Sequence, residues 1–253
     1  MNKRKYLIDG VSRRRQDILG ILPLVLFRPE DVELISGPPD VRRKFLDRLL
    51  IQVDKIYSNS LATYDQALRR RNRLLDAIRE GSASPYSLTF WDGLLIKHGQ
   101  VIQEKRRELV EYINELFGKS ELFRELTVTY DMSAMSETRL SQYKESELAV
   151  GYTLVGPHKD DFQVKAETRD LAVYGSRGEQ RMAVLALKMG EIYFMEEKGN
   201  RKVLLLLDDI FSELDEVHKE EVLRVMSGRQ VVVTTADEGD VVMFKKMKTI
   251  RLS

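Results

Sequence analysis

The chain has 253 residues, of which 43% are hydrophobic and 32% are charged, and its formal net charge is +1. This length allows a sizeable buried core, while the nearly balanced charge gives no bulk signal of nucleic-acid binding. The lack of cysteine excludes disulfides, thiol catalysis and cysteine-ligated zinc. No apolar stretch approaches the ~18 residues of a membrane span and no signal peptide opens the chain, which predicts a soluble protein of the cytoplasm.

The first part of the chain is predicted to form strands and short helical pieces. Tyr6 to Gly10 has the pattern of a strand that ends in a turn, and Leu24 to Phe27 that of a buried strand. The run Gly37 to Pro39 then breaks the pattern. Asp40 suits the N-cap of a helix that begins at Val41.

Three helical stretches follow, at residues 41 to about 56, 60 to 79 and 87 to 117. In each of them apolar residues recur at helical spacing, and the stripe of the first includes Ile56. Such stripes usually form a core, so the stretches are predicted to be antiparallel helices packed on each other.

The segment after these helices is mixed. Leu126 to Tyr130 alternates like a strand, whereas Met132 to Glu147 is polar without a clear period and predicts a loop with a short helix. From about Leu148 an α/β pattern resumes and continues to the end. The sequence therefore predicts a helical insertion inside a split α/β lobe.

A run of five apolar residues, Val203 to Leu207, is followed at once by Asp208 and Asp209. Such a run fits a strand buried on both faces of a parallel sheet, and the carboxyl ends of strands are where open α/β sheets bind ligands. Mg²⁺ prefers one or two carboxylates with waters and phosphate oxygens, so the segment is interpreted as a Walker B element. The alternative is a strand that ends in a solvated acidic turn.

About thirty residues earlier, Gly175 to Gln180 places a Ser between glycines at the start of a helical stretch. Backbone N–H groups there can hold a phosphate, with the Ser hydroxyl as a further donor. The form Ser-x-Gly-x-Gln resembles the signature motif of ABC-type ATPases, although a Ser in this position is more often an ordinary N-cap. Two later segments fit the same order: Ser212 to Asp215 resembles the D-loop, and Val231 to Thr235 resembles the next strand with its switch position.

With these motifs in view, nearly the whole chain resembles the RecF family of bacterial recombination and gap-repair ATPases. Further segments match that family: Phe27 to Asp31, Gly37 to Asp47, Tyr64 to Gln66 with Leu68, Arg71, Asn72 and Leu75, and Gly156 to Phe162. The resemblance implies an α/β, ABC-ATPase-like (P-loop NTPase) head lobe with an inserted α-helical arm domain. Its parts would be head residues 1–39, arm residues 40–148 and head residues 149–253.

The resemblance also implies roles for single residues. Asp208 would be a Mg²⁺ ligand, and Asp209 would be the general base that orients the attacking water. The signature would act in trans on ATP held by a second copy, and the D-loop would lie at the dimer interface. The residues concerned are Ser176, Arg177, Gly178 and Gln180 of the signature, Ser212 and Asp215 of the D-loop, and Thr234 and Thr235 at the switch.

The function implied is ATP-dependent binding to single-stranded and gapped duplex DNA in recombinational repair and the SOS response, with slow hydrolysis. RecR-like and RecO-like proteins would be partners, and ATP would join two heads in a homodimer. The sequence departs from the family in one respect, because it contains no Gly-x-x-x-x-Gly-Lys-Ser/Thr motif. We therefore expect a carboxy-terminal portion of the family, with a head lobe incomplete at its N-terminus and inactive as an ATPase alone.

Two alternatives follow from that departure. The chain can be a non-enzymatic piece that binds DNA or a partner without ATP turnover. It can also be the head of another SMC or Rad50-like ATPase, against which the short helical insertion argues, because those proteins need long heptad arms.

Basic clusters supply candidates for DNA contact, although most such runs are solvated helix faces. The candidates are Arg69, Arg70, Arg73, Lys105 and Arg106. Arg71 belongs to the family-like Arg-Asn pair and is predicted to be structural. His158, in the motif from Gly156 to Phe162, is either a metal or proton-transfer residue or, as we favour, a turn His bonded to backbone.

Overall fold

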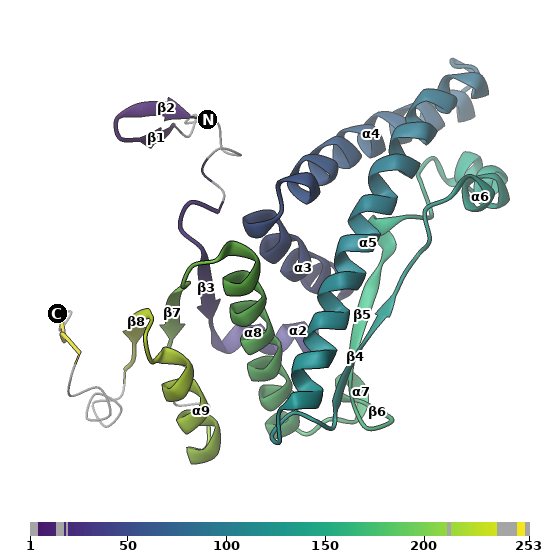
Figure 1. Cartoon of the computed structure of the whole chain (residues 1–253). Coiled ribbons are helices and arrows are strands. Elements are labelled where there is room, and N and C mark those ends of the chain that lie inside the picture. Colours follow the sequence, from purple (N-terminus) through teal and green to yellow (C-terminus); the bar gives the residue numbers. More distant parts are fainter. Residues whose placement is uncertain (1–4, 14–17, 19, 212–213, 237–246, 251–253) are drawn as a thin grey trace.

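The computed structural model describes residues 5–13, 18, 20–211, 214–236 and 247–250. Within these ranges no helix is both long and apolar enough to cross a bilayer. Figure 1 shows a small sheet beside two helices on one side of the molecule and a long helical arm that leads away from it.

A three-stranded parallel sheet carries the predicted Walker B strand and switch strand. Its order is β3 (Leu24–Phe27), β7 (Leu204–Asp208) and β8 (Gln230–Thr234), so the three predicted strands are confirmed. Phe27 pairs with Leu207, and Asp208 pairs with Thr234. The carboxyl ends of all three strands therefore meet at one edge of the sheet.

Burial of this sheet is one-sided. Val25 and Phe27 of β3 and Leu205 and Leu207 of β7 are at most 5% exposed, while the residues between them are only half-buried. The expectation that the run Val203 to Leu207 is buried on both faces is thus wrong for the described part of the chain. Helix α8 (Arg177–Gly199) packs against β3 and against α9 (Glu216–Met226). Burial of each Leu or Phe side chain contributes roughly 1.5–3 kcal/mol to this core.

The arm is built on an antiparallel pair, α4 (Lys55–Arg79) and α5 (Thr89–Lys119), with α3 (Pro39–Val53) at its base (Figure 1). Helix α3 begins at Pro39, so the predicted N-cap at Asp40 is wrong. It ends at Val53 because Asp54 adopts extended backbone and caps α4, accepting from Tyr57 N at 2.9 Å. Ile56 is consequently not part of the stripe of α3 and is 65% exposed.

A second sheet lies along the arm. It is antiparallel with the order β4 (Leu126–Asp131), β5 (Asp161–Ala166) and β6 (Arg169–Asp170). β4 falls in the predicted arm and β5 in the predicted head, so this sheet crosses the predicted boundary at residue 148. The division into domains stays a prediction. Between the two strands runs α6 (Glu137–Val150), a 14-residue helix where only a short one was predicted.

Short elements complete the described structure. The strands β1 (Tyr6–Ile8) and β2 (Val11–Arg13) form a hairpin whose turn, Asp9-Gly10, has positive φ at both positions. The remaining pieces are the 3₁₀ helices η1 (Pro29–Val32), η2 (Pro85–Leu88) and η3 (Pro157–Lys159) and the short helices α2 (Glu33–Ser36) and α7 (Leu171–Tyr174).

Candidate functional site

Asp208 ends β7 at the open edge of the sheet, and its side chain is exposed to solvent. One of its carboxylate oxygens accepts a hydrogen bond from Thr234 Oγ1 at 2.5 Å. Thr234 is the residue opposite Asp208 in the register, so the parallel pairing of β7 and β8 brings the two together. The predicted metal ligand and one predicted switch residue are therefore direct neighbours.

The next residue, Asp209, has left-handed backbone with φ of 51°. Its N–H donates to the carbonyl of Thr234 at 3.0 Å, which fixes the turn that leaves the strand. Asp tolerates this conformation better than most residues with a Cβ, but it is uncommon and often marks a functional position. Thr235, the other predicted switch residue, follows directly after β8 and is half-buried.

The donor set at this edge fits Mg²⁺ only as a shared site. Among the described residues no group of three or more His, Cys, Asp or Glu side chains is placed to hold a metal. Mg²⁺, however, is commonly bound through one or two carboxylates with water and substrate phosphates as the other ligands. The exposed carboxylate of Asp208 fits that requirement.

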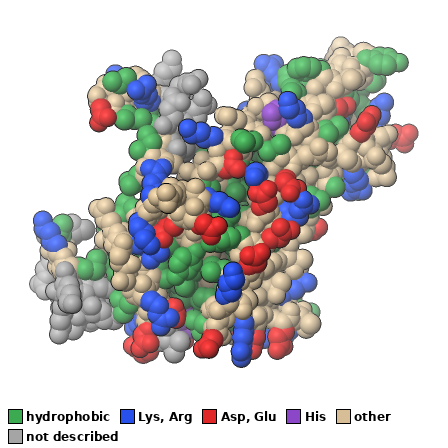
Figure 2. Space-filling view, viewed as in Figure 1, with side chains coloured by type: hydrophobic (Ala, Val, Ile, Leu, Met, Phe, Trp, Pro, Cys, Tyr) green, Lys and Arg blue, Asp and Glu red, His purple; other side chains and the backbone are tan. Residues whose placement is uncertain are grey.

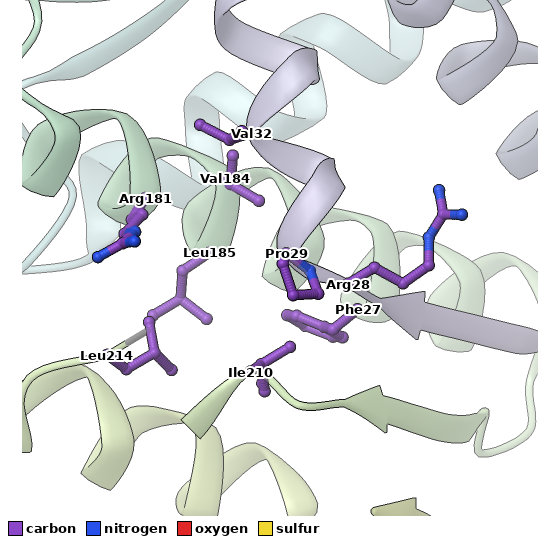
Figure 3. Close-up of a pocket in the computed structure, with 9 residues that line it drawn as sticks. All are labelled: Phe27, Arg28, Pro29, Val32, Arg181, Val184, Leu185, Ile210 and Leu214. Carbon is purple, nitrogen blue, oxygen red and sulfur yellow. The ribbon is translucent and has the colours of Figure 1, made fainter. Parts of the chain in front are cut away.

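An apolar pocket lies beside the ends of β3 and β7. Figure 3 shows Phe27, Ile210, Leu185 and Leu214 converging on it from β3, from the segment after β7 and from α8. The remaining lining residues are Arg28, Pro29, Val32, Arg181 and Val184. The pocket thus lies between the segment after Asp209 and the first turns of α8.

The predicted signature motif forms the N-terminus of α8. Ser176 is the N-cap, and its hydroxyl accepts from Glu179 N at 3.3 Å while Ser176 N donates to a Glu179 carboxylate oxygen at 2.8 Å. This is a capping box, which satisfies two backbone donors of the first turn reciprocally. The N-cap interpretation of Ser176 is therefore confirmed, and the signature prediction concerns this same residue.

The other signature residues divide into exposed and anchored positions. Arg177 and Gly178 are exposed, and a Cβ built on Gly178 would meet nothing within 4 Å. Gln180 instead turns back, and its side-chain amide donates to the carbonyl of Leu171 at 2.8 Å. Gln180 thereby fixes the start of α8 against α7.

The predicted D-loop is described only in part, because Ser212 lies outside the described residues. Asp215 is exposed and caps α9, accepting from His218 N at 2.9 Å. It therefore has a local structural role in addition to any role at an interface.

The basic residues proposed for DNA contact differ in their exposure and in their ion pairs. Arg69, Arg70 and Arg73 are exposed on α4, whereas Lys105 pairs with Glu108 at 2.9 Å and lies 3.8 Å from Asp54. Arg106 is only 2% exposed, so its assignment as a DNA contact is wrong. Figure 2 shows acidic and basic side chains interspersed on the face in view, in keeping with the balanced composition.

Arg106 belongs to a buried junction between the arm and η3. It pairs with Asp160 at 3.2 Å and with Asp47 at 2.7 Å, and it donates to the carbonyl of Pro157 at 2.7 Å. Asp160, which is 0% exposed, also accepts from Gln103 and from Ser133 N. Next to it Arg42 forms a bidentate pair with Asp161 at 2.6 and 2.9 Å.

The same junction explains His158 and Gly156. The two ring nitrogens of His158 lie 2.7 Å from the Tyr64 hydroxyl and 3.0 Å from the Thr153 carbonyl oxygen. Burial lowers the pKa of His158 to about 4, so the ring is neutral near pH 7. Gly156 has φ of 117° and a Cβ there would lie 2.5 Å from the Tyr64 hydroxyl. The motif from Gly156 to Phe162 is therefore a structural junction, and His158 is the backbone-bonded turn His that we favoured.

Sequence reasoning missed a second buried cluster on α8. Lys188 is 5% exposed, donates to the carbonyl of Leu26 at 2.8 Å and pairs with Glu191 at 3.2 Å and Asp31 at 3.4 Å. Burial raises the pKa of Glu191 above its ordinary value. A Lys within the apolar run Leu185 to Met189 was the available signal, since a charge there needs partners.

Comparison with known proteins identifies relatives of this chain. The chain is 35% identical over 249 residues to the DNA replication and repair protein RecF of Herpetosiphon aurantiacus, covering 92% of this chain and 64% of that relative. It is 35% identical over 243 residues to RecF of Lachnoclostridium phytofermentans, with coverages of 92% and 68%. With RecF of Bacillus cytotoxicus it shares 32% over 271 residues, with coverages of 99% and 72%. No protein-family model matches the chain.

A solved structure described as the recombination mediator protein RecF-ATP in the RecFOR pathway superposes with a TM-score of 0.82 at 32% identity. The superposition covers 91% of this chain and 66% of that one. The predicted fold, an ABC-type ATPase head with a helical arm, is thus confirmed, and the chain spans about two thirds of the length of these relatives. On this evidence the chain belongs to the RecF family of DNA replication and repair proteins.

Proposed function

We propose that this chain contributes the Walker B and signature parts of an ATP-controlled DNA clamp of RecF type. The observation that carries the proposal is the placement of Asp208, an exposed carboxylate at the end of β7, in one lobe with Ser176 at the start of α8. These are the two motif positions that phosphoryl transfer to water requires from this part of a head.

In this proposal Asp208 binds Mg²⁺, which would neutralise charge on the phosphates. Asp209 orients the attacking water and takes its proton, with its backbone held by the bond from its N–H to the carbonyl of Thr234. Thr234 holds the carboxylate of Asp208 at 2.5 Å and would respond to a change at the metal. Ser176, Arg177 and Gly178 meet the γ-phosphate of ATP held by the P-loop of a second RecF-type head, while Gln180 braces the loop.

The clamp acts in recombinational gap repair and the SOS response in the cytoplasm, and ATP closes a homodimer on single-stranded or gapped duplex DNA. RecR-like and RecO-like proteins are the partners we propose, supported by a related structure whose description names the RecFOR pathway. The exposed Arg69, Arg70 and Arg73 on α4 are the proposed surface for the DNA backbone.

One observation favours a second candidate. The sequence contains no P-loop motif, whose backbone nest and Lys hold the β- and γ-phosphates. In this alternative the chain binds DNA or a protein partner without ATP turnover.

The catalytic assignment is tested by ATP turnover in this chain joined to a RecF-type P-loop segment. We expect ATP hydrolysis that Asp209→Asn abolishes while ATP binding persists, because the variant removes a water-orienting group and keeps the phosphate contacts. Asp208→Asn should in addition weaken Mg²⁺-dependent binding. Asp131→Asn, at an exposed position on β4, is the control. Equal turnover by wild type and the Asp209 variant would remove the catalytic assignment.

A further inference from the structure

The signature loop carries a negative charge of its own. Glu179 lies in the first turn of α8, and one oxygen of its carboxylate accepts from Ser176 N at 2.8 Å. That hydrogen bond, aided by Arg169, lowers the pKa of Glu179 to about 2, so the group is ionised at any cellular pH. The Glu179 carboxylate is thus bonded to Ser176, the residue that the proposed function places next to a phosphate.

A cation lies against the other oxygen of Glu179. Arg169 comes from β6 and approaches Glu179 to 2.7 Å, while its side chain remains 49% exposed. The two residues are ten positions apart, so the pair does not follow from helical spacing. It follows from the chain reversal at α7, which places the end of β6 beside the first turn of α8.

Several contacts fix this approach. Arg169 pairs in register with Ala166 of β5, which holds it in a two-stranded ladder. Asp170 caps α7 by accepting from Ala172 N at 2.9 Å, and Gln180 ties α8 to the carbonyl of Leu171. Both ends of the α7 segment are therefore anchored, and the guanidinium of Arg169 is held close to Glu179.

The charges around Glu179 are of both signs. Glu167 of the same hairpin adds to the negative field that raises the pKa of Arg169. Arg177 is exposed on the first turn of α8. Without Arg169, the carboxylate of Glu179 would repel a second anion within one helical turn, and partial exposure would screen that repulsion only in part.

We propose that Arg169 is a positioning residue of the signature, which neutralises Glu179 so that the loop accepts a nucleoside triphosphate held by a second RecF-type head. The inference rests on the proposed function and deepens it, since it names the residue that makes an acidic signature compatible with a phosphate. Arg169 acts through Glu179. It offsets the negative charge of the Glu179 carboxylate, while the hydrogen bond from Ser176 N to that carboxylate is kept.

The test uses the fluorescently labelled full chain mixed with full-length Herpetosiphon aurantiacus RecF, with association measured by sedimentation with and without Mg-ATP. We expect Arg169→Gln to weaken ATP-dependent association by about three- to tenfold. Glu179→Gln keeps an acceptor for Ser176 N and should bind at least as well as wild type. The double variant should return to within about twofold of wild type, because no charge is left to neutralise.

The outcomes separate the inference from the proposed function. Failure of the wild-type chain to associate with ATP would overturn both. ATP-dependent association that Arg169→Gln leaves unchanged, or a double variant as weak as Arg169→Gln alone, would overturn the inference only. The second result would mean that Arg169 contacts phosphate directly or supports the fold. Arg107→Gln, which breaks an exposed ion pair with Glu104 on α5, controls for loss of a surface charge and should have no effect.

Discussion

The guanidinium of Arg106 pairs with the carboxylate of Asp160 at 3.2 Å, and both side chains are at most 2% exposed. The pair joins the long arm helix α5 to the segment that leads from η3 into β5. Because β5 begins there, this buried contact ties the arm helix α5 to the antiparallel sheet. It also gives the motif from Gly156 to Phe162 a structural role.

Replacing Arg106 by Met should destabilise the protein by about 3–5 kcal/mol, because it leaves Asp160 buried, and Asp47 half-buried, without their cation. Urea unfolding followed by circular dichroism measures this. Arg107→Met is the matched control, since the neighbouring Arg107 is 48% exposed and should change stability by no more than about 0.5 kcal/mol. Equal midpoints for the two variants would contradict the structural role of Arg106.

His158 should make stability depend on pH in a defined window. Its pKa is lowered from 6.5 to about 4 in the folded protein, so between these values the unfolded chain binds more protons. The contribution of the neutral ring is therefore complete above pH 6.5 and is lost as the pH falls toward 4. At pH 5 the loss should be about 2 kcal/mol relative to pH 8.

Unfolding free energies of wild type and His158→Gln at pH 8 and pH 5 check this expectation, because the ordinary carboxylate titrations are common to both. The variant should lose about 2 kcal/mol less than wild type over this range. His98→Gln, at a half-exposed position on α5, should show a much smaller difference. Parallel pH profiles for wild type and His158→Gln would show that the buried ring is not held neutral.

Patterns local in sequence predicted the parallel sheet, the paired arm helices and the positions of Asp208 and Ser176. They failed where a neighbour in space decided the outcome. Asp54 ends α3 by capping α4, which moved Ile56 from the predicted core to the surface. The length of α6 was missed because its apolar pattern is weak, and its end is set by Gly151 with φ of 81°.

The burial of charged residues was even harder to predict from local sequence patterns. The basic run at Lys105 to Arg107 gave no sign that Arg106 points inward, since its partners Asp47 and Asp160 lie more than fifty residues away. Arg71 was placed correctly as structural, and it pairs with Glu147 at 2.7 Å and Asp92 at 2.6 Å. Burial of an arginine depends on partners that its own segment does not contain.

Removing charge at Arg69, Arg70 and Arg73 should weaken DNA binding about equally for all sequences. Each lost phosphate contact should reduce the slope of log affinity against log salt concentration by about 0.9 on duplex DNA. Filter binding at several salt concentrations with the triple Gln variant measures the slope, and Arg224→Gln, on α9, serves as an exposed control. An unchanged slope in the triple variant would assign this part of α4 to a solvated helix face.

The most direct test of the signature assignment is Ser176→Arg in the labelled full chain, sedimented with full-length Herpetosiphon aurantiacus RecF. Wild-type chain should associate when Mg-ATP is added, because its signature completes the nucleotide site of the relative. The Ser176 variant should stay unassociated at the same concentrations while its unfolding midpoint changes by no more than an N-cap loss, about 1 kcal/mol. Association of the variant as strong as that of wild type would contradict the account.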